Sequence, residues 1–280
     1  MPLPRLIAID IDGTLLDPHF QVSEANVRAL QSAHELGVEI ALVTGRRHTF
    51  ALPIAELLGF PVTMVSSNGA ITRSSTGELF HRDLLPRDAA AALIRHMTDY
   101  RRYFVITFDR VARGTLVCES ADELNVSIQR WMQKNAEYIE FVRPVENALT
   151  EDPVQSMFAG TVALMEKAQA HLLTNPALLE RVTVLKTQYD HRDLCIIDVL
   201  NRGVTKGHAL RRWAEHHAIP RERIVAIGDN FNDIEMLDYA GIPFIMGNAC
   251  AELRSAGYRL TLGNDQNGVA HAVEQVIRPT

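Results

Sequence analysis

The residues best suited to chemistry lie in short polar clusters spread along the chain. The clusters are Asp10-Ile11-Asp12-Gly13-Thr14, Thr44-Gly45-Arg46, Lys206-Gly207, and Gly228-Asp229 with Asn232-Asp233. They supply carboxylates, a hydroxyl group and an ammonium group. Hydrolysis of a phosphate monoester needs a nucleophile, a proton donor and positive charge around an already anionic group. The composition of the clusters therefore predicts a site that acts on phosphate esters.

Asp10 and Asp12 are the candidates for the chemical step. They stand two residues apart, and on an extended segment such side chains project to the same side. Two carboxylates there would repel each other and a phosphate dianion unless a hard, oxygen-preferring Mg²⁺ ion neutralised them, with Asp229 as a third carboxylate. We expect Asp10 to attack phosphorus and form an aspartyl-phosphate. Asp12 would protonate the leaving oxygen and later deprotonate the water that cleaves the intermediate.

Thr44 and Lys206 are the candidates for holding the phosphate. A threonine hydroxyl can bind a phosphoryl oxygen, and the lysine can offset charge on both the phosphate and Asp10. Gly13 permits a close backbone approach at the first turn. Taken singly, each motif has an ordinary explanation, since an Asp-Gly pair is usually a solvated turn. The ordered combination of all of them is what favours a catalytic site.

Apolar runs precede these clusters and predict the elements that position them. Residues 6–11, 38–43, 62–66, 224–227 and 243–246 have the composition of short buried strands. Helical spacing predicts helices over 23–36, 48–58, 206–218 and 233–240, the first with Ser23 as its N-cap. Strands that alternate with helices predict an α/β fold with a doubly wound parallel sheet. Such sheets bind ligands at the carboxyl ends of their strands, where the clusters fall.

The middle of the chain has a different pattern. It predicts helices over 87–100, 122–135 and 166–174, and strands over 103–108 and 114–119. Residues 182–199 suggest two strands joined by a turn at 190–193. Hairpins mixed with helices indicate an α+β unit inserted into the first domain. We therefore expect a core of residues 1–84 and 201–280, and an inserted domain of residues 85–200.

Composition narrows the function further. The chain has 280 residues, 47% of them hydrophobic, and a formal net charge of -6, which argues against a general nucleic-acid binder. Its three cysteines are far apart in the sequence and form no metal-binding spacing, as expected for reduced thiols in a cytoplasmic protein. No apolar run approaches the roughly 18 residues of a membrane span. We expect no nucleic-acid or membrane partner, and a monomer or a homodimer.

The same motifs resemble those of the haloacid dehalogenase superfamily. IAIDIDGTLLD resembles its first motif, LVTGR its second, GVTKGHAL its third and GDNFNDIEML its fourth. The position of the insert and the later MGNA and NDQNGVA stretches resemble the Cof-like branch, subclass IIB. This resemblance implies a Rossmann-like core and an inserted α+β cap domain that closes over the site and selects the substrate.

The resemblance also implies roles for individual residues. Asp10 would be the nucleophile and a Mg²⁺ ligand, and Asp12 would be the acid/base and lend its main-chain oxygen to the metal. The full implied metal set is Asp10, Asp12, Asp229 and Asp233, and the implied phosphate or substrate contacts come from Thr44, Gly45, Lys206, Asn232 and Asn68. For Asn68, a simple turn within Asn68-Gly69-Ala70 is as plausible as a direct ligand contact.

The expected activity is hydrolysis of a small phosphorylated metabolite, either a sugar phosphate or a phosphorylated cofactor such as pyridoxal or flavin phosphate. A phosphomutase is the nearest alternative, and it would need a bisphosphorylated activator. A non-catalytic sensor of phosphorylated ligands is a further alternative. Such a sensor would be expected to lack Asp10, Asp12 or Asp229, and all are present.

Overall fold

The structure is a computed structural model that describes residues 2–121 and 126–277. The chain divides into two compact units, and each is described by itself. Unit 1 comprises Met1–Arg82 and Thr205–Thr280, and unit 2 comprises Asp83–Val204. That unit 1 is catalytic and unit 2 selects the substrate stays a prediction. No described helix is long and apolar enough to cross a lipid bilayer.

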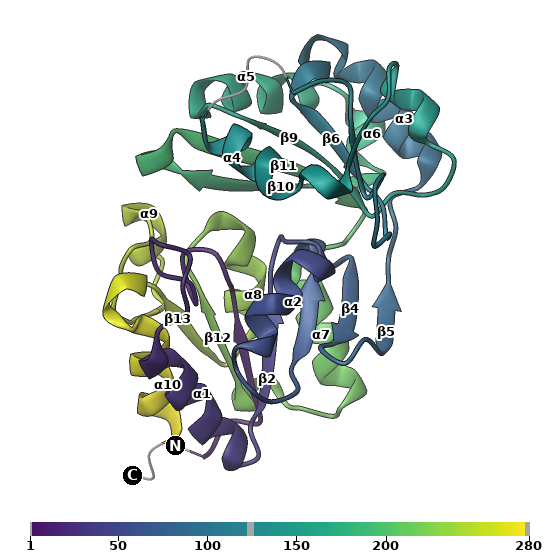
Figure 1. The fold of residues 1–280 in the computed structure, drawn as a ribbon. Helices are drawn as coiled ribbons and strands as arrows, with labels where there is room; N and C mark the ends of the chain where they lie inside the picture. Colours follow the sequence, from purple (N-terminus) through teal and green to yellow (C-terminus); the bar gives the residue numbers. More distant parts are fainter. Residues whose placement is uncertain (1, 122–125, 278–280) are drawn as a thin grey trace. The chain divides into compact units, whose positions relative to one another are not determined.

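Within the described residues, unit 1 is built on an eight-stranded sheet of order β14-β13-β12-β1-β2-β3-β4-β5 (Figure 1). The strands from β14 to β3 run parallel, and β4 and β5 add an antiparallel hairpin at one edge. Their bounds are β1 (Leu6–Ile9), β2 (Glu39–Val43), β3 (Thr63–Ser66), β4 (Ile71–Ser74), β5 (Leu79–Arg82), β12 (Ile224–Gly228), β13 (Ile242–Ile245) and β14 (Arg259–Leu260).

Helices cover both faces of this sheet. The helices are α1 (Glu24–Glu35), α2 (His48–Glu56) and α10 (Gly268–Ile277) on one face, and α7 (Lys206–His216), α8 (Ile234–Tyr239) and α9 (Ala251–Arg254) on the other. Alternation along β1 explains the two cores, because Ile7 and Ile9 belong to the first and Leu6 and Ala8 to the second. A strand buried on both faces has to be apolar throughout, as β1 is.

The predicted α/β class with a doubly wound parallel sheet is confirmed. The predicted N-cap of α1 is also present, since the Ser23 side chain accepts a hydrogen bond from the backbone N–H of Asn26. The hairpin β4–β5 and the helix α10 were not predicted. The hairpin strands ITRS and LFHR mix polar and charged residues with apolar ones and are short, so they give little periodic signal.

Unit 2 has its own six-stranded sheet of order β10-β11-β9-β6-β7-β8, with helices at its faces (Figure 1). Among the described strands of unit 2, only β7 and β8 pair in parallel. The strands are β6 (Phe104–Thr107), β7 (Leu116–Cys118), β8 (Ile139–Phe141), β9 (Gln155–Gly160), β10 (Val182–Tyr189) and β11 (Leu194–Asn201), and the helices are α3 (Arg87–His96), α4 (Val126–Lys134), α5 (Val162–Leu172) and α6 (Pro176–Leu179).

The predicted hairpin over 182–199 is present as β10 and β11, but β8, β9 and α6 were not predicted. The predicted helix 87–100 is wrong in its last turn. It ends at His96, where the Thr98 hydroxyl donates to the carbonyl of Arg95 (2.8 Å), and a 3₁₀ segment follows. The predicted helix 122–135 is observed only as α4, because residues 122–125 lie outside the described part.

Candidate active site

The order of the central strands brings three predicted clusters together at the carboxyl ends of these strands. β1 lies between β12 and β2, and all three run parallel, so their carboxyl ends lie together. Asp10 follows β1, Thr44 follows β2 and Asp229 follows β12. Backbone hydrogen bonds extend the strand pairing beyond the ends of the strands. The N–H of Asp10 donates to the carbonyl of Ile227 (3.0 Å), and the N–H of Thr44 donates to the carbonyl of Val65 (2.8 Å).

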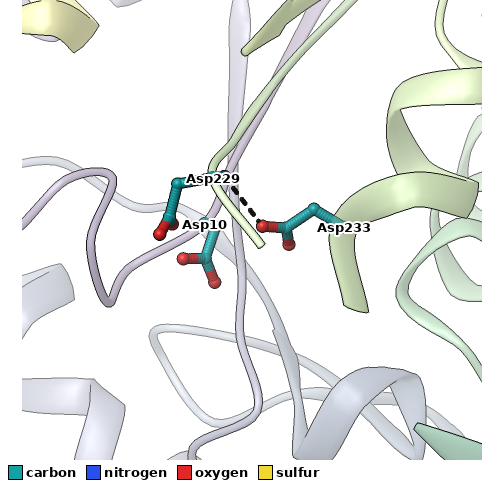
Figure 2. A group of neighbouring side chains, drawn as sticks. All are labelled: Asp10, Asp229 and Asp233. Carbon is teal, nitrogen blue, oxygen red and sulfur yellow. Dashed lines mark hydrogen bonds between the residues drawn. The ribbon is translucent and has the colours of Figure 1, made fainter. Parts of the chain in front are cut away.

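Three buried carboxylates meet at the carboxyl ends of the central strands. Asp10, Asp229 and Asp233 each offer one oxygen, and these atoms lie within 4.8 Å of one another. Figure 2 shows the three side chains turned into the same space from different chain segments. Their exposed fractions are 4%, 6% and 0%. Carboxylates that are this close together and this deeply buried repel one another strongly unless cations balance their charge.

Lys206, the first residue of α7, supplies one of these cations. Its Nζ donates to Oδ1 of Asp10 and to Oδ1 of Asp233, both at 2.6 Å, and its side chain is almost completely buried. Burial alone would lower the pKa of Lys206, but attraction to Asp10 and Asp233 outweighs it and raises the pKa. Lys206 is therefore a permanent cation in this site.

One ammonium group does not neutralise three carboxylates. Burial raises the pKa of Asp10 from 3.8 to about 7, against the opposing attraction of Lys206 and with added repulsion from Asp233 and Asp12. Burial and repulsion from Asp10 and Asp233 also raise the pKa of Asp229 well above its usual range. The cluster consists of hard oxygen donors with excess negative charge, so it fits a hard divalent cation.

The loop after β12 is shaped by Asp233 and by Gly13. Oδ2 of Asp233 accepts hydrogen bonds from the backbone N–H groups of Asp229 and Asn230, both at 3.0 Å. The Thr14 hydroxyl donates to Oδ1 of Asp229 (2.8 Å). Gly13 has φ +88°, and a Cβ there would lie 2.4 Å from Oδ2 of Asp229. Only glycine allows the two loops to approach this closely.

Asp12 lies differently from the expectation drawn for an extended segment. β1 ends at Ile9, and a turn follows, so the argument for side chains two apart on a strand does not apply. Among the described residues, the triad of converging carboxylates is completed by Asp233 and not by Asp12. The carboxylate of Asp12 instead forms an ion pair with Arg46.

Thr44, Gly45, Asn68 and Asn232 are brought together as a second, polar part of the site. The N–H of Asn68 donates to the carbonyl of Thr44, and the Asn232 side-chain amide donates to Oδ1 of Asn68, both at 2.9 Å. A Cβ on Gly45 would lie 3.2 Å from Oδ1 of Asn68. Asn68 has φ +53° and lies in a tight turn, as the first of its two interpretations predicted. Direct ligand contact stays a prediction.

Three residues at the site had been given no role from the sequence. Thr14 binds Asp229, Arg46 binds Asp12, and the Asn248 side-chain amide donates to the carbonyl of Gly13 (2.8 Å). Thr14 and Arg46 stood inside the clusters and Asn248 inside the MGNA stretch, so their positions carried a signal. Their partners are remote in sequence, and a single sequence does not reveal such pairs.

Comparison with known proteins decides the family. The family model described as "haloacid dehalogenase-like hydrolase" matches residues 7–273. The chain belongs to this family. The resemblance to the haloacid dehalogenase superfamily is confirmed, and the chain is a phosphatase-type hydrolase.

Individual haloacid dehalogenase-like proteins match over most of their length. Phosphatase YwpJ of Bacillus subtilis (strain 168) is 31% identical, over 98% of this chain and all of that protein. Pyridoxal phosphate phosphatase YbhA of Escherichia coli (strain K12) is 28% identical, over 88% of each chain. The solved structure of a haloacid dehalogenase-like hydrolase from B. subtilis has a TM-score of 0.80 at 26% identity, covering 97% of this chain and 99% of that one.

Proposed function

We propose that the protein is a Mg²⁺-dependent phosphatase that hydrolyses small phosphorylated metabolites through an aspartyl-phosphate on Asp10. The observation that carries this proposal is the contact of Asp10 with buried Lys206 beside Asp229 and Asp233. The ammonium group gives the nucleophile and an incoming phosphate a shared positive partner. A divalent cation would balance the negative charge of the carboxylates that Lys206 alone does not neutralise.

The proposed reaction has two steps. Lys206 holds Oδ1 of Asp10, so Oδ2 is the oxygen that would attack phosphorus in line. The P–O ester bond breaks as the new P–O bond to Asp10 forms, and the leaving oxygen takes a proton from Asp12. Asp12 then takes a proton from water, whose oxygen attacks the phosphorus of the aspartyl-phosphate. Inorganic phosphate leaves and Asp10 is regenerated.

The proposed metal site uses Asp10 and Asp229 as carboxylate ligands, with the main-chain oxygen of Asp12 implied by the family resemblance. Mg²⁺ there would supply positive charge against the phosphate and the carboxylates. Both oxygens of Asp233 already accept hydrogen bonds, from Lys206 and from two backbone N–H groups. We therefore assign Asp233 chiefly to holding the loop and Lys206, and its direct ligation stays a prediction.

The proposed phosphate site uses the polar residues that lie beside the carboxylates, at the carboxyl ends of the central strands. The Thr44 hydroxyl accepts a hydrogen bond from the N–H of Arg46 (3.1 Å), so its own proton remains for a phosphoryl oxygen. Gly45 brings backbone close to Asn68, and Asn232 and Asn68 carry amides beside it. With Lys206, these groups would surround the phosphate with donors.

The proposed substrates are sugar phosphates or phosphorylated cofactors, and residues 85–200 would act as the cap that selects among them. The pyridoxal phosphate phosphatase among the relatives supports the cofactor class. A phosphomutase would use the same first step but pass the phosphoryl group to a sugar hydroxyl. Release of inorganic phosphate therefore separates the two functions.

The test is phosphate release from a panel of phosphorylated metabolites, with Mg²⁺ and with a chelator, for the wild type and Asp10→Asn. We expect Mg²⁺-dependent release that is lost in Asp10→Asn, with circular dichroism showing that the variant is folded. Activity that survives in folded Asp10→Asn would contradict the nucleophile. Isomerised sugar phosphate without inorganic phosphate would indicate a mutase.

A further inference from the structure

Arg46 grips the carboxylate of Asp12 with two hydrogen bonds. Its Nε donates to Oδ2 and its Nη2 donates to Oδ1, both at 2.6 Å. This bidentate geometry fixes both the position and the plane of a carboxylate, which a single contact would not do. The pair is largely sheltered from water, with 14% of the Arg46 side chain and 29% of the Asp12 side chain exposed.

Arg46 is itself held from several sides. Its N–H donates to the Thr44 hydroxyl, and its carbonyl accepts from the N–H of Ser67 (2.8 Å). Its guanidinium carbon lies 4.8 Å from the ring centroid of Phe50, the third residue of α2. The guanidinium group therefore has a fixed orientation, and its two hydrogen bonds in turn fix the orientation of the Asp12 carboxylate.

The contact with Arg46 leaves acceptor positions on both carboxylate oxygens of Asp12. Each carboxylate oxygen has about two lone pairs, and Arg46 uses one on each oxygen. Arg46 itself stays protonated and takes no part in proton transfer. Arg46 is the cationic partner of Asp12, whereas Lys206 binds Asp10 and Asp233.

We propose that Arg46 is the positioning residue for proton transfer by Asp12. The inference rests on the proposed function, in which Asp12 gives a proton to the leaving oxygen as the P–O ester bond breaks and Asp10 bonds to phosphorus. A basic alkoxide needs this proton, whereas a weakly basic phenolate leaves without it. Loss of Arg46 should therefore slow the first step, the transfer of the phosphoryl group to Asp10, far more for esters of alcohols than for esters of acidic phenols.

The experiment measures kcat and KM on an alkyl phosphate and on p-nitrophenyl phosphate for the wild type, Arg46→Ala, Arg46→Lys and Asp12→Asn. General acid catalysis contributes about 10²–10⁴-fold, so we expect Arg46→Ala to lose about 10²-fold in kcat/KM on the alkyl ester and less than about tenfold on the aryl ester. The ratio kcat/KM is compared because it reports the first step alone, whereas kcat also contains the hydrolysis of the aspartyl-phosphate, in which Asp12 acts for both esters. Added guanidinium should restore part of the lost kcat/KM on the alkyl ester. Arg46→Lys should retain an intermediate rate, because lysine offers charge without the fork.

Arg47→Ala is the matched control. Arg47 also lies by the Phe50 ring (5.4 Å), but its guanidinium donates to the Thr49 hydroxyl. This variant should keep the wild-type ratio of the two rates. Equal losses of kcat/KM on both esters in Arg46→Ala and Arg46→Lys, with a selective loss of kcat/KM in Asp12→Asn, would overturn the role of Arg46 and leave the proposed function standing. Absence of a selective loss of kcat/KM in folded Asp12→Asn would overturn both the role of Arg46 and the proposed acid role of Asp12.

Discussion

At the scale of single residues, the charges of the site favour catalysis over stability. Asp10, Asp229 and Asp233 gather around one buried lysine, and the pKa values of Asp10 and Asp229 are raised by burial first and by mutual repulsion next. A carboxylate that is costly to ionise in the fold is a group that a cation or a phosphoryl group can relieve. This arrangement explains why the same residues would serve both metal and substrate.

The raised pKa of Asp10 predicts how the metal-free protein responds to pH. Between 3.8 and about 7 the folded state binds more protons at Asp10 than the unfolded state does, so this group lowers the free energy of unfolding as pH rises, with the full loss above pH 7. Asp10→Asn should therefore be more stable than the wild type in chelator at about pH 8 and differ less at about pH 5. Urea denaturation at both pH values checks this. A less stable Asp10→Asn at the higher pH would contradict it.

At the scale of elements, the turn after β3 connects two parts of the site. Ser67, Asn68 and Gly69 all have positive φ, and a Cβ on Gly69 would lie 2.3 Å from the carbonyl oxygen of Thr205. Thr205 is the N-cap of α7, which starts at Lys206. The turn therefore fixes where Lys206 enters the site.

Gly69→Ala is expected to affect both stability and catalysis. Left-handed backbone costs an L-residue roughly 1–2 kcal/mol, and the contact with Thr205 adds to that cost. Displacement of Thr205 should also lower kcat, since Lys206 follows it. Gly37→Ala is the control, because Gly37 has φ +82° and a Cβ there would meet nothing within 4 Å. Thermal unfolding and kcat measure both effects, and equal losses in the two variants would contradict the role of the turn.

The core strands and the clusters at their ends were predictable because a strand buried on both faces leaves a continuous apolar run, as β1 and β12 do. The hairpin β4–β5 was not, since its residues are largely polar and its pairing is with a sheet edge. The ion pair between Arg46 and Asp12 was not predictable either, because it joins residues 34 positions apart. Such a pair depends on the order of β1 and β2 in the sheet, which no local pattern encodes.

At the scale of the whole molecule, each unit has cores made only of its own residues. The two core clusters of unit 2 draw on residues between Leu85 and Val199, and those of unit 1 on residues outside that range. A domain with its own core can fold alone. This organisation allows the chemistry and the proposed choice of substrate to vary independently.

Residues 83–204 are therefore expected to fold as an isolated fragment. The fragment should show a cooperative thermal transition by circular dichroism and dispersed amide signals in a proton–nitrogen spectrum. The full-length protein, measured in parallel, is the control for secondary structure content. A fragment that stays unfolded under native conditions would contradict the independence of this unit.

The measurement that tests the central claim most directly is the mass of the enzyme after rapid acid quenching during turnover with Mg²⁺ and a good substrate. The account predicts that a fraction of the wild-type protein gains one phosphoryl group, that peptide mapping places it on Asp10, and that Asp10→Asn gains none. A phosphoryl group on another residue would contradict the proposed nucleophile. Rapid turnover with no phosphorylated enzyme, even when Asp12→Asn slows its hydrolysis, would contradict the aspartyl-phosphate mechanism.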